Sequence, residues 1–326
     1  MGQRLLSLDF IKLFAMFGVI CLHTEMNFYE NPLAQFLYMT AVVSIPLFFM
    51  TSGYLLYGKQ SVDYHYSAHK IVGILRFVAI MTITFWLLTG MRHGESFWWF
   101  TAGSLIQKGN LGIYWYFGAM MILYALLPMQ HKLYVKYPKA FLLGTIVLGI
   151  VSNCIFLSNF YGYEIEENTI QTFRLWNWIF YFNLGGILRR YTVKSSLALV
   201  LVLFIFNYLF QYELIPLMPT VYCEYFYCSL PVMLLSGFFF VYAVKIDDSK
   251  LQFVCGRGKL FLPCYTFHIF IIGKTMGKFE QYIYSISDYT APLFWIIVAI
   301  LTVIISWLIM KLPYMDRIFV STQIRA

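Results

Sequence analysis

Apolar runs of about twenty residues, separated by short polar stretches, follow one another along the whole chain. A helix rises about 1.5 Å per residue, so a run of this length crosses the hydrocarbon core of a bilayer. The pattern predicts an all-α, polytopic membrane helix bundle with about ten transmembrane helices. The expected spans are residues 4–24, 35–57, 71–90, 111–128, 139–158, 173–190, 195–212, 223–244, 259–273 and 291–311. The shorter apolar stretch 96–107 predicts an interfacial or re-entrant helix.

Composition supports a membrane protein and excludes a soluble one. Of the 326 residues, 60% are hydrophobic and only 12% are charged, which is far too apolar for a soluble domain of this size. We therefore expect a single transmembrane domain over residues 1–326. The formal charge is +8, but the basic residues stand singly or in pairs between apolar runs, so no basic face for nucleic acid can form.

The positions of the basic residues also predict the topology. If the N-terminus is cytoplasmic, most lysines and arginines fall in cytoplasmic segments, among them Lys59, Lys70, Arg189 and Arg190. Cytoplasmic loops of membrane proteins carry such an excess. Both termini are therefore expected in the cytoplasm.

The first apolar run, residues 4–24, carries three ionisable residues: Asp9, Lys12 and His23. Each costs roughly 2.5 kcal/mol or more inside a bilayer, so their presence needs a reason. At about 100° per residue, all three lie within about 60° of one another on the helix. Asp9 and Lys12 belong to the cytoplasmic half, and His23 lies about 16 Å further along the axis. The pattern indicates one polar stripe that connects the two sides of the membrane.

Each residue of the stripe has a structural and a functional interpretation. Lys12 can reach back towards the inner headgroups, but its neighbour Asp9 favours a paired site that binds an anionic group from the cytoplasm. His23 can be an ordinary interfacial histidine. Its alignment with Lys12 favours a general base for an attacking hydroxyl, or a transient carrier of an acyl group.

Two further regions hold candidate residues. His268 lies near mid-depth of the run 259–273 with Tyr265 one turn before it, and a structural hydrogen bond is as good an explanation as a function. Lys70 and Arg76 begin the third run, where they either set topology or bind phosphates. His65 and His69 have helical metal-ligand spacing but no third ligand, so no metal is expected.

Five stretches, in order, resemble the acyltransferase family 3 membrane enzymes. The first is Lys12, ten intervening residues and His23, preceded by Asp9. The others are IPLFFMTSGYLL at 45–56, IYWYFGAMMILYALLP at 113–128, YFNLGGILRR at 181–190 and GKLFLPCYTFHIFI at 258–271. Together they cover nearly the whole chain.

This resemblance implies a ten-span enzyme of the bacterial cytoplasmic (inner) membrane. Such enzymes take an acyl group, usually acetyl, from cytoplasmic acyl-coenzyme A and transfer it to hydroxyls of cell-envelope glycans or lipid-linked saccharides. By resemblance, His23 is the catalytic histidine, and Lys12, the expected cation, and Asp9 are catalytic residues with it. The expected cosubstrate is acetyl-coenzyme A, bound by Lys12, Lys70, Arg76 and Arg189. The expected substrate contacts are Trp115, Tyr116, Tyr265, His268 and Glu164.

The chain departs from the family pattern at two places. Family members commonly have arginine where this chain has Lys12, and lysine cannot form the same two-pronged contact. Many have two arginines three residues apart before the third span, where this chain has Lys70 and Arg76. No fused hydrolase-like domain follows the last span, so a stand-alone enzyme is expected.

Two other classes of function fit the same residues. In a transporter or flippase of an envelope precursor, Asp9, Lys12 and His23 would form a buried relay without covalent chemistry. A catalytically silent assembly protein would tolerate substitution of all three. Only an enzyme must consume acyl-coenzyme A.

Overall fold

We describe a computed structural model of the chain over residues 6–24, 31–94, 96–109, 111–218, 223–254, 257–286 and 290–320. The chain divides into two compact units, residues 1–52 with 190–326 (unit 1) and residues 53–189 (unit 2). All regular elements of the described residues are helices, which confirms the all-α prediction.

Unit 1 contains the first helices of the chain and the helices of residues 190–326. Its elements are α1 (Leu6–His23), α2 (Pro32–Thr40), η1 (Ala41–Val43), the first part of α3 (Ser44–Tyr57), α9 (Leu197–Leu214), α10 (Leu230–Val244), η8 (Asp248–Val254), α11 (Phe261–Ile286), α12 (Thr290–Ile309) and α13 (Met315–Val320).

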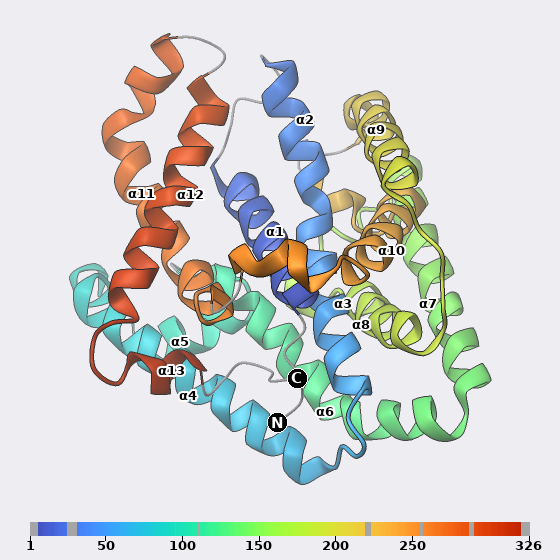
Figure 1. The fold of residues 1–326 in the computed structure, drawn as a ribbon. Coiled ribbons are helices and arrows are strands. Elements are labelled where there is room, and N and C mark those ends of the chain that lie inside the picture. The colour runs from blue at the N-terminus through green and yellow to red at the C-terminus, as the bar shows by residue number, and fades with distance from the viewer. Residues whose placement is uncertain are drawn as a thin grey trace. The chain divides into compact units, whose positions relative to one another are not determined.

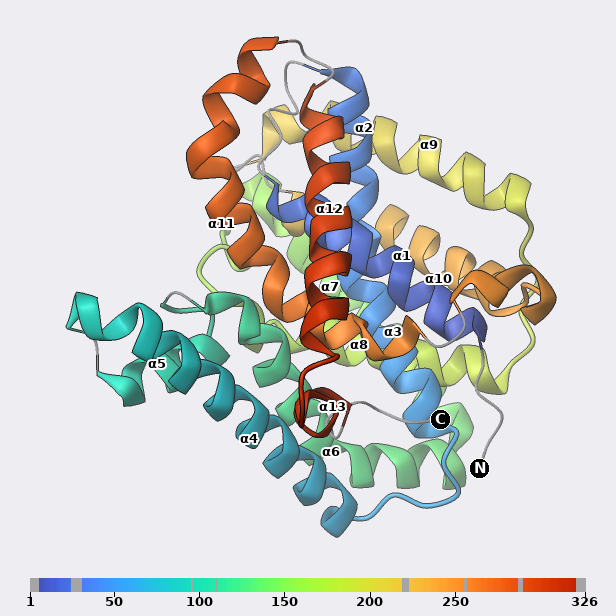
Figure 2. The same ribbon diagram turned by 60° about the vertical axis from the view of Figure 1, so that its left-hand side comes forward.

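Helix α1 is the centre of unit 1. It contacts α2, α10, α11, α12 and η8, while α11 pairs with α12, and α9 with α10 (Figures 1 and 2). A Cβ at Gly18 would overlap the Ser44 hydroxyl, so glycine allows α1 to approach the start of α3. The indole N–H of Trp295 on α12 donates to the Phe17 carbonyl of α1 at 3.0 Å. The polar residues of α1 therefore belong to a helix that is packed on several faces.

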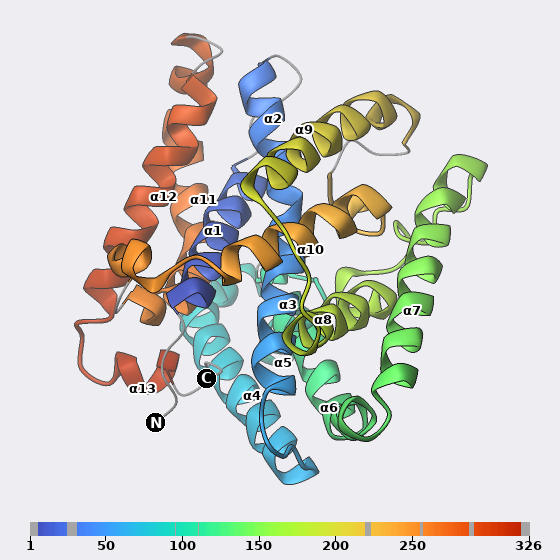
Figure 3. The ribbon, with the colours of Figure 1, turned by 45° about the vertical axis from the view of Figure 1, so that its right-hand side comes forward.

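Unit 2 begins within α3 and ends with α8. Its further elements are α4 (Tyr64–Leu88), α5 (Phe97–Leu105), η3 (Gly112–Tyr114), α6 (Trp115–Lys136), α7 (Pro138–Ser158), η5 (Gln171–Phe173) and α8 (Leu175–Arg190). Helix α6 contacts both α4 and α7 (Figure 3). A Cβ at Gly53 would overlap the Phe182 carbonyl, so glycine also lets α3 lie directly against α8.

The predicted count of ten membrane spans is not confirmed. Seven helical segments of the described residues are long and apolar enough to cross a membrane. An eighth arises if α10 and η8, which meet at a bend of 103°, form one broken span. The predicted span at 173–190 is α8, whose 16 residues reach only about 24 Å, less than the hydrocarbon core of about 30 Å. The protein is a multi-pass membrane protein with seven or eight helices of spanning length among the described residues, and ten spans stay a prediction.

Two helices test the predicted segments: the short helix is confirmed, and the start of the third span is corrected. The stretch 96–107 does form a short helix, α5, which begins at Phe97 after a Ser96 cap. The third span was predicted to begin at residue 71, but α4 begins at Tyr64. The reason is Asp63, whose carboxylate accepts the Tyr66 N–H at 2.7 Å and so caps a helix start that the apolar pattern does not mark.

The two units are not joined by loose linkers. The first boundary lies inside α3 and the second at the last residues of α8. The single domain over 1–326 stays a prediction. The cytoplasmic placement of the termini also stays a prediction, because residues 1–5 and 321–326 lie outside the described residues.

Candidate active site

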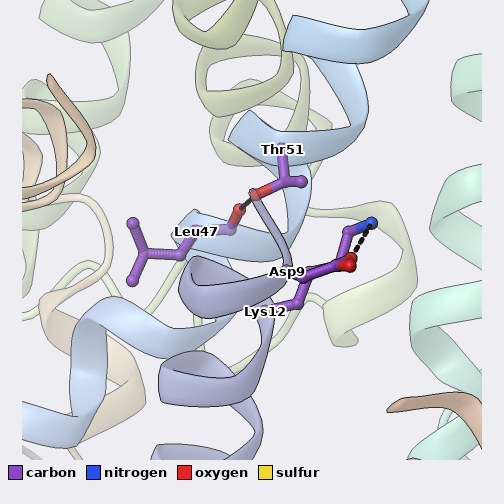
Figure 4. A network of polar contacts seen from close by, with 4 residues as sticks. All are labelled: Asp9, Lys12, Leu47 and Thr51. Atoms are coloured by element: carbon purple, nitrogen blue, oxygen red, sulfur yellow. Dashed lines mark hydrogen bonds and ion pairs between the residues drawn. The ribbon is translucent and has the colours of Figure 1, made fainter. Parts of the chain in front are cut away.

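Asp9 and Lys12 form an ion pair on α1. The Lys12 Nζ lies 3.9 Å from the Asp9 Oδ1, and the two side chains leave α1 on the same side (Figure 4). The Asp9 side chain is 6% exposed and that of Lys12 is 23% exposed. An acidic residue this deeply buried requires a positive partner, which Lys12 provides. The pairing predicted from the (i, i+3) spacing is confirmed.

His23 is the last residue of α1. Thr24 ends the helix, since both its N–H and its hydroxyl turn back to the Cys21 carbonyl, at 3.3 and 2.9 Å. The imidazole of His23 is partly buried and contacts that of His268, with ring centroids 5.3 Å apart and planes tilted by 43°. Two histidines separated by 245 positions in the sequence thus meet at the end of α1.

His268 is fully buried on α11 and its ring is fixed on one side. Its Nδ1 lies 2.8 Å from the Tyr265 carbonyl and 3.2 Å from the Cys264 carbonyl. Carbonyls only accept, so Nδ1 must carry the proton and Nε2 the lone pair. This Nε2 is buried and has no hydrogen-bond partner among the described residues. The Tyr265 ring lies 5.9 Å from that of His268, which gathers His23, His268 and Tyr265 at one place in unit 1.

The polar stripe predicted on α1 therefore has two separate parts. Asp9 pairs with Lys12 near the start of the helix, and His23 contacts His268 at its end. His23 lies eleven positions after Lys12, which is about 16 Å along a helix axis. Side chains cannot bridge this separation directly, so a ligand that uses both parts must be extended.

In unit 2, three cations gather where α3 ends. The Nζ atoms of Lys59 and Lys70 lie 5.6 and 5.9 Å from the centre of the same Tyr66 ring. The Arg189 guanidinium stacks on Tyr54, 5.0 Å from its ring centre, and a Cβ at Gly58 would overlap it. Because Gly58 directly precedes Lys59, we treat Lys59, Lys70 and Arg189 as one cation cluster.

This cluster changes the predicted set of cations. Arg76 is exposed and lies six residues after Lys70 on the continuous helix α4, which turns the two about 120° apart. Arg76 therefore lies on a different side of α4 from Lys70, and we do not count it in the cluster. Lys59 and Tyr66 were missed, although Gly58 and Lys59 directly follow the predicted span 35–57. Their part in the cluster depends on α4 starting early enough to bring Tyr66 beside them.

The remaining predicted substrate residues also lie in unit 2. Trp115 packs on the fully buried Trp178, with ring centroids 5.2 Å apart, so most of Trp115 serves the packing of α6 on α8. Tyr116 is partly buried, and its ring lies 6.4 Å from that of Trp115. Glu164 is exposed on the segment between α7 and α8.

No three His, Cys, Asp or Glu side chains gather in the described part of the chain in a way that could hold a metal ion. His65 and His69 are both exposed on α4.

Fold and site together define a multi-pass membrane protein whose first helix carries a buried ion pair and ends at a pair of histidines. Residues 5–311 match the acyltransferase 3 family model, described as an acyltransferase domain, and the chain belongs to this family. The protein is therefore a membrane acyltransferase. No curated protein and no solved structure matches the chain.

Proposed function

We propose that this protein is an O-acyltransferase that moves an acetyl group from cytoplasmic acetyl-coenzyme A to a hydroxyl of a cell-envelope glycan or lipid-linked saccharide in the bacterial inner membrane. One observation carries the proposal: the family's first helix ends at His23, which contacts a second, buried histidine. A histidine there suits proton transfer from a hydroxyl, since the unperturbed pKa of the residue, about 6.5, is close to neutral.

The cation cluster supports the coenzyme A part of the proposal. Lys59 and Lys70 hold two positive charges around one tyrosine ring, and Arg189 lies against the residue before Lys59. Three cations beside one short segment would suit a ligand with several negative charges, such as the phosphates of coenzyme A. Lys12, in unit 1, would bind an anionic group of the donor, and Arg76 would contribute only from outside the cluster.

The transfer step uses the lone pair of His23. A ring nitrogen of His23 takes the hydroxyl proton while the hydroxyl oxygen attacks the thioester carbonyl. The tetrahedral intermediate then expels the coenzyme A thiolate, which recovers the proton from the imidazolium. The products are an acetyl ester and free coenzyme A, and His23 returns to its neutral form. General-base catalysis of this kind contributes about 10²- to 10⁴-fold to the rate.

The acceptor would be held by aromatic and hydroxyl groups. Tyr265 stands beside the histidine pair and would contact the saccharide nearest the transferred group. Trp115, Tyr116 and Glu164, in unit 2, would contact the acceptor through stacking and hydrogen bonds.

The proposal is tested with purified protein, labelled acetyl-coenzyme A and an extract of envelope glycans. We expect His23→Ala to lower the rate of label transfer by at least a hundredfold, with the thermal stability of the protein retained. Tyr314→Phe, an exposed site just before α13, is the matched control and should transfer at the wild-type rate. Transfer by His23→Ala at the wild-type rate would remove His23 from the mechanism.

A further inference from the structure

Among the described histidines, only His268 has a ring nitrogen that is fully buried, carries a lone pair and has no hydrogen-bond partner. It is 0% exposed, and the Tyr265 and Cys264 carbonyls hold its Nδ1–H. A buried polar atom without a partner costs about 1–3 kcal/mol, so it is retained where it has another use. The use must be to accept a hydrogen bond, because Nε2 carries a lone pair in this tautomer.

The neighbour that can supply this hydrogen bond is His23. Nε2 is closed off from solvent, which leaves no direct access for a large acceptor. The His23 ring contacts the His268 ring, at 5.3 Å between centroids and with a tilt of 43°. A turn of the His23 ring brings one of its N–H groups towards Nε2. Catalytic hydrogen bonds are often poorly aligned without substrate and tighten when substrate binds.

We propose that His268 is a positioning residue for His23. In this arrangement the Tyr265 carbonyl accepts from Nδ1–H of His268, and Nε2 of His268 accepts from one ring N–H of His23. The other nitrogen of His23 is thereby left unprotonated and directed at the acceptor hydroxyl. The inference rests on the proposed function of His23 and adds the group that selects its tautomer.

In many active sites a third group orients the base that activates the nucleophile. Here the base is His23, and the neutral imidazole of His268 holds the place usually taken by a carboxylate. Two imidazolium rings at this separation would repel each other, so the pair holds one extra proton at most. That proton belongs on His23, because Nδ1–H of His268 is already committed and Nε2 only accepts. His268 thus stabilises the imidazolium of His23 by a hydrogen bond and takes no part in moving the proton.

Two substitutions separate this role from a purely structural one. His268→Asn keeps a donor near the position of Nδ1 and loses the acceptor at Nε2. His268→Gln reaches further and can present an amide oxygen near Nε2. We expect kcat to fall by about 10- to 100-fold in His268→Asn, part of the general-base contribution, with the KM values nearly unchanged. His268→Gln should recover much of the lost kcat. If His268 were purely structural, His268→Asn would have the higher kcat of the two, because it keeps the donor near Nδ1.

Thr275→Val is the matched control. Thr275 lies seven residues after His268 on the same face of α11, and its hydroxyl donates to the Ile271 carbonyl at 2.6 Å, another bond from a side chain to its own helix. Its loss should leave kcat unchanged.

The tautomers can be observed directly by ¹⁵N NMR of protein labelled at its six histidines, with coenzyme A added so that the donor site is occupied and no turnover occurs. We expect the Nε2 signal of wild-type His268 to show an accepted hydrogen bond that disappears in His23→Ala. An Nε2 signal that is the same in wild type and His23→Ala overturns the proposal, and this measurement does not depend on the folding of any His268 variant. If His23→Ala stays active, the proposed function fails instead, whatever the NMR result.

Discussion

At the scale of residues, the Asp9–Lys12 pair shows how a membrane helix tolerates a charge. Asp9 is almost fully enclosed, while Lys12 retains 23% exposure of its side chain. Loss of the ion pair would therefore cost the Asp9 carboxylate more than the Lys12 ammonium, which still reaches solvent. A buried ion pair is by itself weak evidence for stability, because an apolar pair of similar size often stabilises a protein as much.

This asymmetry gives a prediction for stability. Lys12→Met leaves Asp9 buried without its positive partner, and we expect a loss of unfolding free energy somewhat below the ~3–5 kcal/mol of a fully buried pair, since Lys12 is partly exposed. The double variant Asp9→Asn with Lys12→Met should recover a large part of that loss. The measurement is thermal unfolding in detergent across the four proteins of the cycle. Strictly additive losses would mean that the two side chains do not depend on each other.

At the scale of elements, the cation cluster depends on two helix ends meeting. The end of α3 brings Tyr54, Gly58 and Lys59, and the end of α8 brings Arg189, whose Nη1 also donates to the Tyr54 carbonyl at 3.4 Å. Helix α4 adds Tyr66 and Lys70 because Asp63 caps it early. A small residue at position 58 is required for Arg189 to lie where it does.

Gly58→Ala tests the cluster without removing any charge. The added methyl group would overlap the Arg189 guanidinium and displace it, so we expect the KM for acetyl-coenzyme A to rise several-fold with little change in kcat. Steady-state kinetics with the acceptor held saturating make the comparison.

The control for this substitution is Gly144→Ala on α7, where an added Cβ meets open space and alanine favours the helix by up to ~1 kcal/mol. An unchanged donor KM in Gly58→Ala would place the coenzyme A phosphates elsewhere.

At the scale of the whole molecule, transfer and transport predict different changes in the envelope glycan. An acetyltransferase changes the mass of the envelope glycan by one acetyl unit per modified hydroxyl. A transporter or flippase with a buried Asp/Lys/His relay would change the amount of glycan outside without changing its mass.

Mass analysis of envelope glycans from cells with and without the protein distinguishes these outcomes. We expect acetyl units to disappear when the protein is absent and to return with the wild-type chain, while His23→Ala fails to restore them. Glycan that changes in quantity alone, with identical masses, would favour transport.

The sequence by itself determined the class of the molecule and the identity of its central helix. Apolar runs long enough for a bilayer leave the backbone no option but helices, and the (i, i+3) spacing of Asp9 and Lys12 is a local property of one helix. The apolar pattern missed the start of α4, because the Asp63 cap and the polar first turns of that helix are not visible in hydrophobicity.

Only the tertiary structure decided which distant residues meet. His268 and His23 come together through the packing of α11 on α1, and Lys59 shares Tyr66 with Lys70 through the junction of α3 and α4. Neither contact can be predicted from the spacing of residues in the sequence, since each depends on how two helices are rotated and shifted against each other. The direction in which the His268 lone pair points is fixed by carbonyls of its own helix, but its importance comes from the histidine that the fold places beside it.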